Sequence, residues 1–256
     1  MRHEITIFFT ALMFYTRIPC PKWIDHKEEY LNEATRYFPL IGYLIGLATA
    51  IVVYLALFIF PPPIAVILSM LTSILMTGAF HEDGFADVCD GFGGGWTKEK
   101  ILEIMKDSRV GTYALVGLGL LLSLKMFTLI ALVEINLLFC AKSMLFSHII
   151  SRFSAIMLMF THHYSRDDQT SKVKPIAKKL STKNFLYSAI WLIPACFLFQ
   201  SPIILLVFIP IYLLKAYLGS YFTKWIGGYT GDCLGATQQL SEICTLLFCL
   251  AWANFK

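Results

Sequence analysis

Residues 39–80 read PLIGYLIGLATAIVVYLALFIFPPPIAVILSMLTSILMTGAF and contain no charged side chain. A helix that crosses a bilayer needs about 20 consecutive apolar residues, so this stretch is long enough for two spans. The three prolines at 61–63 divide it, because proline lacks the amide that a helix interior needs and biases the preceding residue towards extended geometry. The sequence therefore predicts two membrane-spanning helices joined by a tight turn.

The rest of the chain also has the composition of a membrane protein. Of the 256 residues, 57% are hydrophobic and 15% are charged, whereas soluble domains have about 25% charged residues. Pro194 and Pro202 favour two short helices over one long helix in their region. Apolar runs predict five further spans, at 110–133, 137–160, 184–200, 202–223 and 236–254.

The uncharged run from Ile5 to Thr16 is too short to span a bilayer and predicts an N-terminal interfacial or re-entrant helix. No cleavable signal peptide is expected, because Arg17-Ile18-Pro19 follows the run in place of a small-residue cleavage site. The predicted fold class is therefore all-α: a polytopic integral membrane protein of about seven transmembrane helices. We expect one domain over residues 1–256.

Lysine and arginine fall almost entirely on one side of this topology. Five lie before residue 39, four in 81–109, six in 161–184 and one in 219–235, whereas only Lys256 lies on the opposite side. Cytoplasmic loops carry the excess of these residues, so we expect the N-terminus and the basic loops to face the cytoplasm. The net charge of +4 reflects this bias and does not indicate a nucleic-acid partner.

Residues 77–95 read TGAFHEDGFADVCDGFGGG and place Asp83, Asp87 and Asp90 at i, i+4 and i+7. On a helix, this spacing puts three carboxylates on one face, where they repel unless a cation compensates them. Oxygen ligands suit Mg²⁺ or Mn²⁺, and Glu82 is a further candidate ligand. The glycines weaken a helix but give a phosphate access to backbone amides. The alternative is a solvated acidic loop that caps a span.

His81 and the segment after the glycines are further candidates. His81 can orient a ligand or transfer a proton, although an interfacial histidine without a chemical role fits equally well. Residues 97–112 have the spacing of a surface helix and end in Lys106-Asp107-Ser108-Arg109-Val110-Gly111-Thr112. Its cations are candidates for phosphate binding, and Asp107 is a candidate base or metal ligand. Alternatively, Asp107 or Ser108 is the N-cap of the next helix.

A third polar stretch, WIGGYTGDCLGATQQLSE at 225–242, begins the last predicted span. Asp232 is either a site residue or the N-cap of that span, and Thr230 and Gly231 lie beside it. Ionisable side chains inside membranes are functional candidates because they are costly to bury. Within the predicted spans they are Lys125, Lys142, Arg152 and Glu242, whereas Lys215 can reach the interface through its long stem.

Together these segments resemble the cobalamin synthase family, the adenosylcobinamide-GDP ribazoletransferases. The resemblance covers almost the whole chain and rests on six motifs in family order. They are Arg17-Ile18-Pro19, Phe38-Pro39-Leu40-Ile41-Gly42, His81-x-Asp83-Gly84-x-x-Asp87-x-x-Asp90-Gly91, Glu103-Ile104-Met105-Lys106-Asp107-Ser108-Arg109-x-Gly111, Ser151-Arg152 and Gly228-x-Thr230-Gly231-Asp232-x-Leu234-Gly235.

The resemblance implies a Mg²⁺-dependent transfer at the cytoplasmic face of a bacterial inner membrane. A ribose hydroxyl of α-ribazole, or of its 5′-phosphate, attacks the phosphate on the cobinamide arm of adenosylcobinamide-GDP, and GMP leaves. Together with the candidates above, the expected catalytic residues are His81 and Asp107, and the expected metal ligands are Glu82, Asp83, Asp87 and Asp90. The expected substrate-binding residues are Lys106, Ser108, Arg109, Arg152, Thr230, Gly231 and Asp232.

Two other functions are compatible with an acidic membrane site. A CDP-alcohol phosphotransferase shares Asp87-x-x-Asp90-Gly91, but the sequence continues as Phe92-Gly93-Gly94-Gly95-Trp96 where that class expects Ala-Arg. A divalent-cation transporter usually has its acids near the bilayer midplane, whereas these acids lie next to a span. The oligomeric state is left open, a homo-oligomer included.

Overall fold

The computed structural model describes residues 2–21, 23–24, 28–165 and 180–255. This part of the chain is helical, with one isolated β-bridge between Tyr164 and Tyr229. In chain order the helices are α1 (Arg2–Tyr15), α2 (Glu28–Ala34), η1 (Thr35–Tyr37), α3 (Phe38–Ala56), α4 (Pro62–Thr77), α5 (Phe80–Gly94), α6 (Lys98–Ile104), α7 (Thr112–Ile135), α8 (Leu137–Thr161), α9 (Thr182–Ile190), α10 (Leu192–Cys196), η2 (Pro202–Val207), α11 (Phe208–Ile226) and α12 (Gly231–Asn254).

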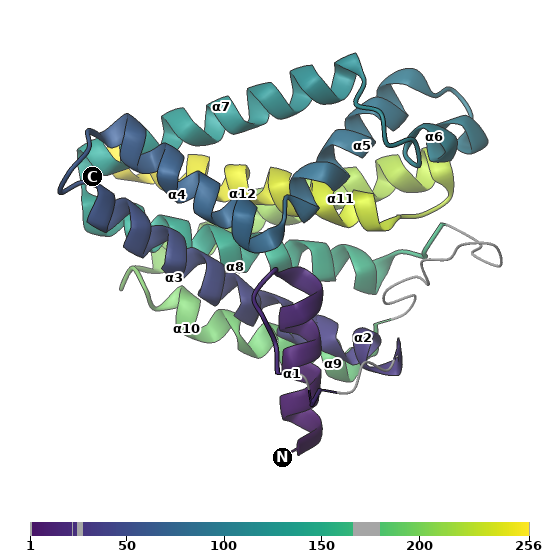
Figure 1. Cartoon of the computed structure of the whole chain (residues 1–256), viewed down its shortest axis with the longest axis horizontal. Helices are drawn as coiled ribbons and strands as arrows, with labels where there is room; N and C mark the ends of the chain where they lie inside the picture. Colours follow the sequence, from purple (N-terminus) through teal and green to yellow (C-terminus); the bar gives the residue numbers. More distant parts are fainter. Residues whose placement is uncertain (1, 22, 25–27, 166–179, 256) are drawn as a thin grey trace.

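The long helices form a bundle. Figure 1 shows α3, α4, α7, α8, α11 and α12 running lengthwise beside one another, while α1 lies across them. Within the described residues, five segments are long and apolar enough to cross a membrane, and the bent pair α4–α5 gives a sixth if it counts as one span. The prediction of an all-helical, polytopic membrane protein is therefore confirmed, with five or six spans in place of about seven.

The difference in count has two local causes. The region predicted as the span 184–200 is broken into α9 and α10, of nine and five residues, because Pro194 interrupts the helix. The second span of residues 39–80 begins at Pro62, after the proline turn as expected, but has only 16 residues before the chain bends. Most of the predicted basic loop 161–184 lies outside the described residues, at 166–179.

The chain turns by 89° between α4 and α5. Two consecutive residues adopt left-handed backbone conformations there, Gly78 with φ 66° and Ala79 with φ 57°. Their amides bond back to the last turn of α4, with Ala79 N donating to the carbonyl oxygen of Ile74 at 2.9 Å. Alanine rarely adopts this conformation because its Cβ crowds the following carbonyl, so the bend is held by its surroundings and not by local preference.

Glycines set the closest helix contacts in the bundle. A Cβ on Gly42 of α3 would lie 2.5 Å from the His148 carbonyl oxygen of α8, and one on Gly46 would lie 2.8 Å from the Leu145 Cα. In a bilayer, small residues let backbones approach and gain van der Waals contact that lipid does not supply. The pair α3–α8 is therefore fixed at the two glycines.

We expect Gly42→Ala to lower the thermal unfolding midpoint of the detergent-solubilised protein, since its Cβ has no room against the α8 backbone. Overpacking of this kind costs about 1–3 kcal/mol. Gly119→Ala in α7 is the matched control, because nothing lies within 4 Å of the added Cβ. Equal midpoints for the two variants would contradict the close contact of α3 with α8.

Candidate active site

The acidic side chains of α5 do not share one environment. Asp83 is exposed and Asp87 is partly exposed, whereas His81, Glu82 and Asp90 are buried, at 3%, 6% and 9% exposure. The expected alignment of three carboxylates on one accessible face therefore holds for Asp83 and Asp87 only. Asp90 is turned towards α7, and Glu82 is turned into the bundle.

Asp90 caps the N-terminus of α7. Its Oδ2 accepts a hydrogen bond from Gly111 N at 2.6 Å, and its Oδ1 accepts one from Ala114 N at 2.9 Å. The first amides of a helix have no partner within the helix, and a carboxylate there also meets the positive end of the helix dipole. The alternative that Asp107 or Ser108 is the N-cap of this helix is wrong: the N-cap is Gly111, and Asp90 supplies the side chain that binds the free amides.

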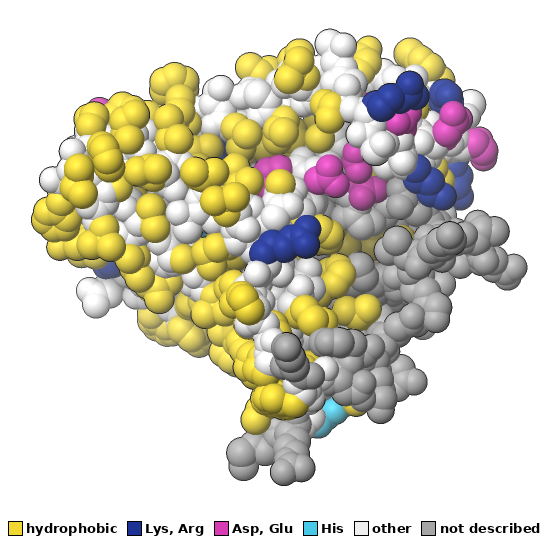
Figure 2. Space-filling view, viewed as in Figure 1, with side chains coloured by type: hydrophobic (Ala, Val, Ile, Leu, Met, Phe, Trp, Pro, Cys, Tyr) yellow, Lys and Arg dark blue, Asp and Glu magenta, His cyan; other side chains and the backbone are white. Residues whose placement is uncertain are grey.

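α12 meets α5 at a pair of glycines. A Cβ on Gly84 would lie 3.0 Å from the Asp232 Cα, and one on Gly235 would lie 3.2 Å from the His81 carbonyl oxygen. This contact brings the start of α12, and with it the partly exposed Asp232, beside the acidic helix. Figure 2 shows Asp and Glu side chains gathered on this part of the surface, with Lys and Arg on two sides of them.

Thr230 is the N-cap of α12, in place of Asp232. Its Oγ1 accepts a hydrogen bond from Cys233 N at 3.3 Å and donates one to Asp232 Oδ2 at 3.3 Å. The preceding turn is held by the chain after α8, since Tyr229 N donates to the His163 carbonyl oxygen at 2.9 Å. Thr230 is fully buried, so its hydrogen bond holds Asp232 from the protein interior. Gly231, between them, is exposed.

The loop between α6 and α7 presents Lys106, Ser108 and Arg109 to solvent. Asp107 accepts hydrogen bonds from the Arg109 side chain on both carboxylate oxygens, including Nε to Oδ1 at 3.0 Å, and a further one from Arg109 N at 3.0 Å. The hydrogen bonds from the Arg109 side chain, followed by the one from its backbone, lower the pKa of Asp107 to about 2. A carboxylate with so low a pKa is a weak proton acceptor near neutral pH.

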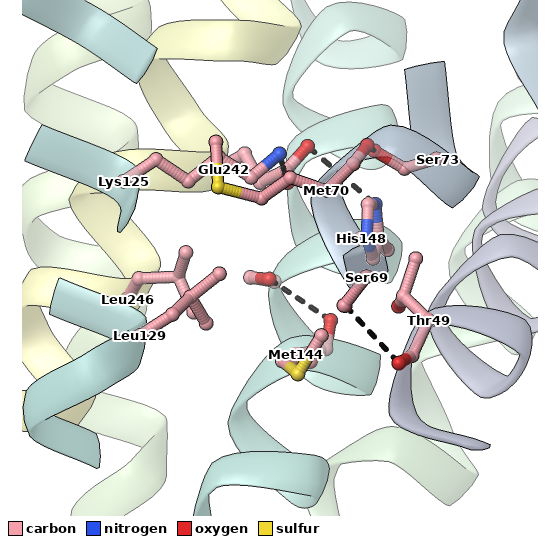
Figure 3. A pocket seen from close by; sticks show the side chains of 11 residues that line it. Thr49, Ser69, Met70, Ser73, Lys125, Leu129, Met144, His148, Glu242 and Leu246 are labelled. Carbon is pink, nitrogen blue, oxygen red and sulfur yellow. Dashed lines mark hydrogen bonds and ion pairs between the residues drawn. The ribbon is translucent and has the colours of Figure 1, made fainter. Parts of the chain in front are cut away.

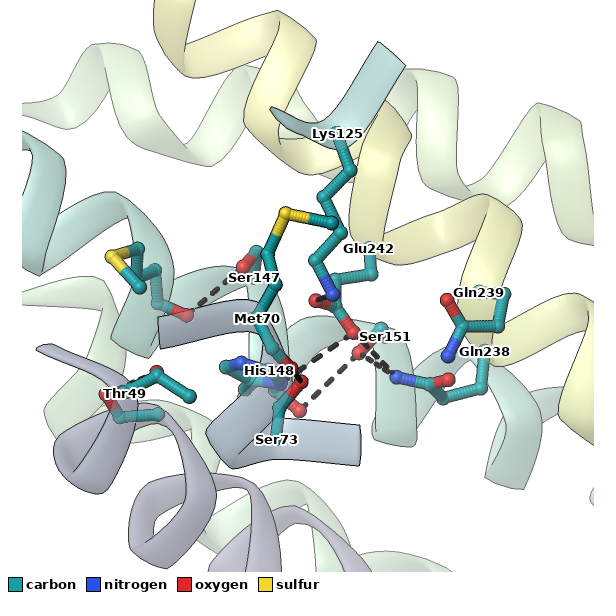
Figure 4. A network of polar contacts seen from close by, with 12 residues as sticks. Thr49, Met70, Ser73, Lys125, Ser147, His148, Ser151, Gln238, Gln239 and Glu242 are labelled. Atoms are coloured by element: carbon teal, nitrogen blue, oxygen red, sulfur yellow. Dashed lines mark hydrogen bonds and ion pairs between the residues drawn. The ribbon is translucent and has the colours of Figure 1, made fainter. Parts of the chain in front are cut away.

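Behind α5 lies a buried network of ionisable side chains from three spans (Figure 4). Lys125 of α7 is paired with Glu242 of α12, and Glu242 also lies 3.5 Å from Nδ1 of His148 on α8. Arg152, one turn further along α8, donates to the His148 carbonyl oxygen at 2.9 Å. Gln238 donates to Glu242 Oε2 at 2.8 Å. All five side chains are almost fully enclosed.

A small cavity adjoins this network (Figure 3). Its volume of about 10 Å³ is close to what one water molecule occupies. The cavity has a mixed lining of polar and apolar side chains, which are Thr49, Ser69, Met70, Ser73, Lys125, Leu129, Met144, Ser147, His148, Glu242 and Leu246. The cavity is too small for a substrate group. We therefore assign the network a structural role, that of holding the helices of the bundle together.

The network reaches α5 through Glu82 and His81. Gln239 of α12 donates to Glu82 Oε1 at 2.9 Å, and the His81 ring stacks on Phe38 with centroids 5.7 Å apart. The Arg152 guanidinium lies over the same Phe38 ring at 5.5 Å. Among the described residues, five buried atoms of this region have no hydrogen-bond partner: His81 Nε2, Glu82 Oε2, Arg152 Nε, Gln238 Oε1 and Glu242 Oε1. Of these, Glu242 Oε1 is ion-paired with Lys125.

Sequence reasoning did not assign a role to Gln239. The available signal was a pair of adjacent amides, Gln238 and Gln239, inside a predicted span, where buried polar side chains need partners. In the part of the chain that the structure describes, no three His, Cys, Asp or Glu side chains are grouped so that they could hold a metal ion on their own. Any ion bound at Asp83 and Asp87 would need ligands from elsewhere.

Comparison with known proteins gives full-length matches. The family model described as "Cobalamin-5-phosphate synthase" matches residues 7–250. A relative from Shewanella frigidimarina, named adenosylcobinamide-GDP ribazoletransferase, is 45% identical over 255 residues, covering 97% of this chain and 95% of its own. A relative of the same name from Leptospira interrogans is 43% identical over 249 residues, covering 95% and 94%. No solved structure matches the chain.

We expect Asp90→Asn to destabilise the protein, because Gly111 N and Ala114 N bind different carboxylate oxygens, and the amide NH2 that replaces one of these oxygens cannot accept a hydrogen bond. Losing a helix cap costs about 0.5–2 kcal/mol, which thermal unfolding in detergent will report. Asp83→Asn is the matched control, since Asp83 is exposed on the same helix. An Asp90→Asn midpoint equal to that of Asp83→Asn would contradict the capping role.

Proposed function

The chain belongs to the cobalamin-5-phosphate synthase family, and we propose that it is an adenosylcobinamide-GDP ribazoletransferase, as its relatives are named. A ribose hydroxyl of α-ribazole, or of its 5′-phosphate, attacks the phosphate attached to the cobinamide arm. A P–O bond forms to the ribose, the P–O bond within the diphosphate breaks, and GMP leaves. Phosphoryl transfer of this kind depends mainly on positioning and on neutralising charge around the phosphates.

The observation that carries this proposal is the meeting of α5 and α12. Asp83 and Asp87 are the accessible carboxylates of α5, and the contact at Gly84 puts the partly exposed Asp232 beside them. Mg²⁺ is usually held by one or two carboxylates, with waters and substrate phosphates as its other ligands. The absence of a group of three among the described side chains fits such a shared site. We assign Asp83 and Asp87 as the Mg²⁺ ligands, with Asp232 next to them.

When bound, Mg²⁺ neutralises the phosphates and favours deprotonation of the attacking hydroxyl. Lys106 and Arg109 lie in a loop that follows α6, and α6 packs on α5 where a Cβ on Gly91 would meet Met105. Both cations are exposed and can bind phosphate at the rim of the site. Ser108 and Gly231 are exposed and can contact substrate as well.

Most of the other predicted residues act from inside the protein. Asp90 holds the start of α7 and Thr230 holds the start of α12. Glu82 and Arg152 belong to the buried network. His81 is enclosed against Phe38, and Asp107 is bound to Arg109. We therefore assign neither residue as the base that accepts the proton of the attacking hydroxyl.

The protein is a multi-pass membrane protein, and we place the site at the cytoplasmic face of a bacterial inner membrane. The support is the distribution of Lys and Arg, which lie with Asp83 and Asp87 on one side of the topology. The substrates are then bound from the cytoplasm while the helices stay in the bilayer.

We expect Asp83→Asn and Asp87→Asn each to reduce GMP release from adenosylcobinamide-GDP by about 100-fold or more, with thermal stability unchanged, since even loss of a side chain that only orients a metal ligand costs about 10- to 100-fold. The assay uses protein reconstituted in liposomes with α-ribazole and Mg²⁺. Glu99→Gln is the control, an exposed acid at the start of α6. Near-normal turnover of either aspartate variant would remove that residue from the metal site.

Orientation is testable with single cysteines, introduced after the seven native cysteines are replaced by serine and labelled by a membrane-impermeant maleimide. Trp96 is 81% exposed near the site, and Phe255 is 91% exposed beyond α12. In intact cells, Trp96→Cys should stay unlabelled until the membrane is permeabilised, whereas Phe255→Cys should react at once. The reverse pattern would place the site on the outer face.

A further inference from the structure

Arg17 has a fixed backbone position at the bend between α4 and α5. Its amide donates a 2.7 Å hydrogen bond to the Met76 carbonyl oxygen in the last turn of α4. The residue after it is held too, because Ile18 N donates to Thr16 Oγ1 at 3.1 Å. The chain that follows α1 is therefore attached to the bend, and Arg17 is the point of attachment.

The side chain of Arg17 lies over Gly78. If Gly78 carried a Cβ, that atom would contact Arg17 Nε and would lie 3.1 Å from Cγ and 3.2 Å from Cζ. The guanidinium thus occupies the space that a side chain at 78 would take, directly before α5 begins. Gly78 is needed here twice, for its φ of 66° and for this space.

Arg17 lies at the N-terminal end of the helix that carries the accessible acids. Asp83 lies one turn after Ala79, the N-cap of α5, since its amide donates to the Ala79 carbonyl oxygen at 2.9 Å. Asp87 lies one turn further along the same side of the helix, and helical side chains lean towards the N-terminus. The Asp83 carboxylate therefore extends towards the end of the helix where the guanidinium lies. Both side chains are exposed, yet no ion pair within 4 Å joins them.

The other arginines whose side chains the structure describes each have a partner. Arg36 is paired with Glu4 at 2.8 Å, Arg109 with Asp107, and Arg152 with His148. Within the described residues, the Arg17 guanidinium has no hydrogen-bond or ion-pair partner. A planar guanidinium binds phosphate oxygens bidentately, and next to carboxylates it supplies the positive charge that a phosphate needs there.

We propose that Arg17 binds a phosphate of the nucleotide diphosphate substrate, on the side of the acids away from Lys106 and Arg109. The inference rests on the proposed function, because it assigns one more contact in that same site. Cations then flank the carboxylates on two sides, as the surface in Figure 2 has them. Gly78 is the positioning residue for this contact.

The decisive experiment separates the two substrates. In neutral phosphatidylcholine liposomes, Arg17→Gln should raise the KM for adenosylcobinamide-GDP by about 10- to 100-fold, the range of a lost charge-assisted hydrogen bond, and leave the KM for α-ribazole unchanged. Arg17→Lys keeps the charge without the bidentate geometry, so its KM for adenosylcobinamide-GDP should lie between those of the wild type and Arg17→Gln. Lys100→Gln is the control, an exposed cation paired with Glu103 on α6.

A second readout is independent of turnover. By equilibrium dialysis without α-ribazole, Arg17→Gln should weaken binding of adenosylcobinamide-GDP and leave binding of adenosylcobinamide, which lacks the diphosphate, unchanged. Gly78→Ala should reproduce the KM effect by displacing the guanidinium, whereas Gly119→Ala should not. The Gly78 variant also tests the assignment if the Arg17 variants fold poorly.

Three results would overturn the assignment. Unchanged kinetics and binding in Arg17→Gln would remove Arg17 from the site, and equal changes in both KM values would indicate a structural role. An Arg17→Gln effect seen only with anionic lipid in the liposomes would show that Arg17 binds lipid phosphate. Failure of the proposed function looks different, because the wild-type protein would then neither bind nor turn over adenosylcobinamide-GDP.

Discussion

The architecture depends on helices that contact one another at glycines, which have no side chain to hold the backbones apart. Lipid is as apolar as the helix surfaces, so burial of apolar area does not drive spans together, and close backbone contact and interhelical hydrogen bonds take that role. Here α5 and α12 meet at Gly84 and Gly235. That contact puts Gln239 within hydrogen-bond distance of Glu82, and it sets Asp232 beside the acidic helix. A larger residue at Gly84 would separate the two halves of the site.

The buried network concerns charged side chains that lie far from water. An isolated charge in a membrane bundle is strongly unfavourable, and a buried pair is tolerated only when its geometry is good and its remaining polar atoms are satisfied. Glu242 has Lys125, His148 and Gln238 around it. The network therefore fixes α7, α8 and α12 relative to one another, behind the helix that carries the accessible acids.

Much of the fold could be predicted because it follows from apolar runs, and the proline turn before α4 is encoded locally. The bend at Gly78 and Ala79 could not, since an alanine in a left-handed conformation leaves no signal in the sequence. Asp83 and Asp87 were predicted from spacing, and the structure keeps them accessible. The cap at Asp90 was missed because its partner amide is 21 residues away. Spacing shows which residues share a helix face, but not which neighbouring helix that face meets.

The hydrogen bond from Gln239 to Glu82 joins residues 157 positions apart. During synthesis, α5 is therefore made long before its partner exists. Until α12 is inserted, the Glu82 carboxylate lacks the amide that binds it, Gly84 faces lipid or a temporary neighbour, and Asp232 is not yet beside the acids. The two segments of the site mature together, as the final step of assembly of the helices described here, so an incomplete nascent chain carries the acidic motif without a formed site.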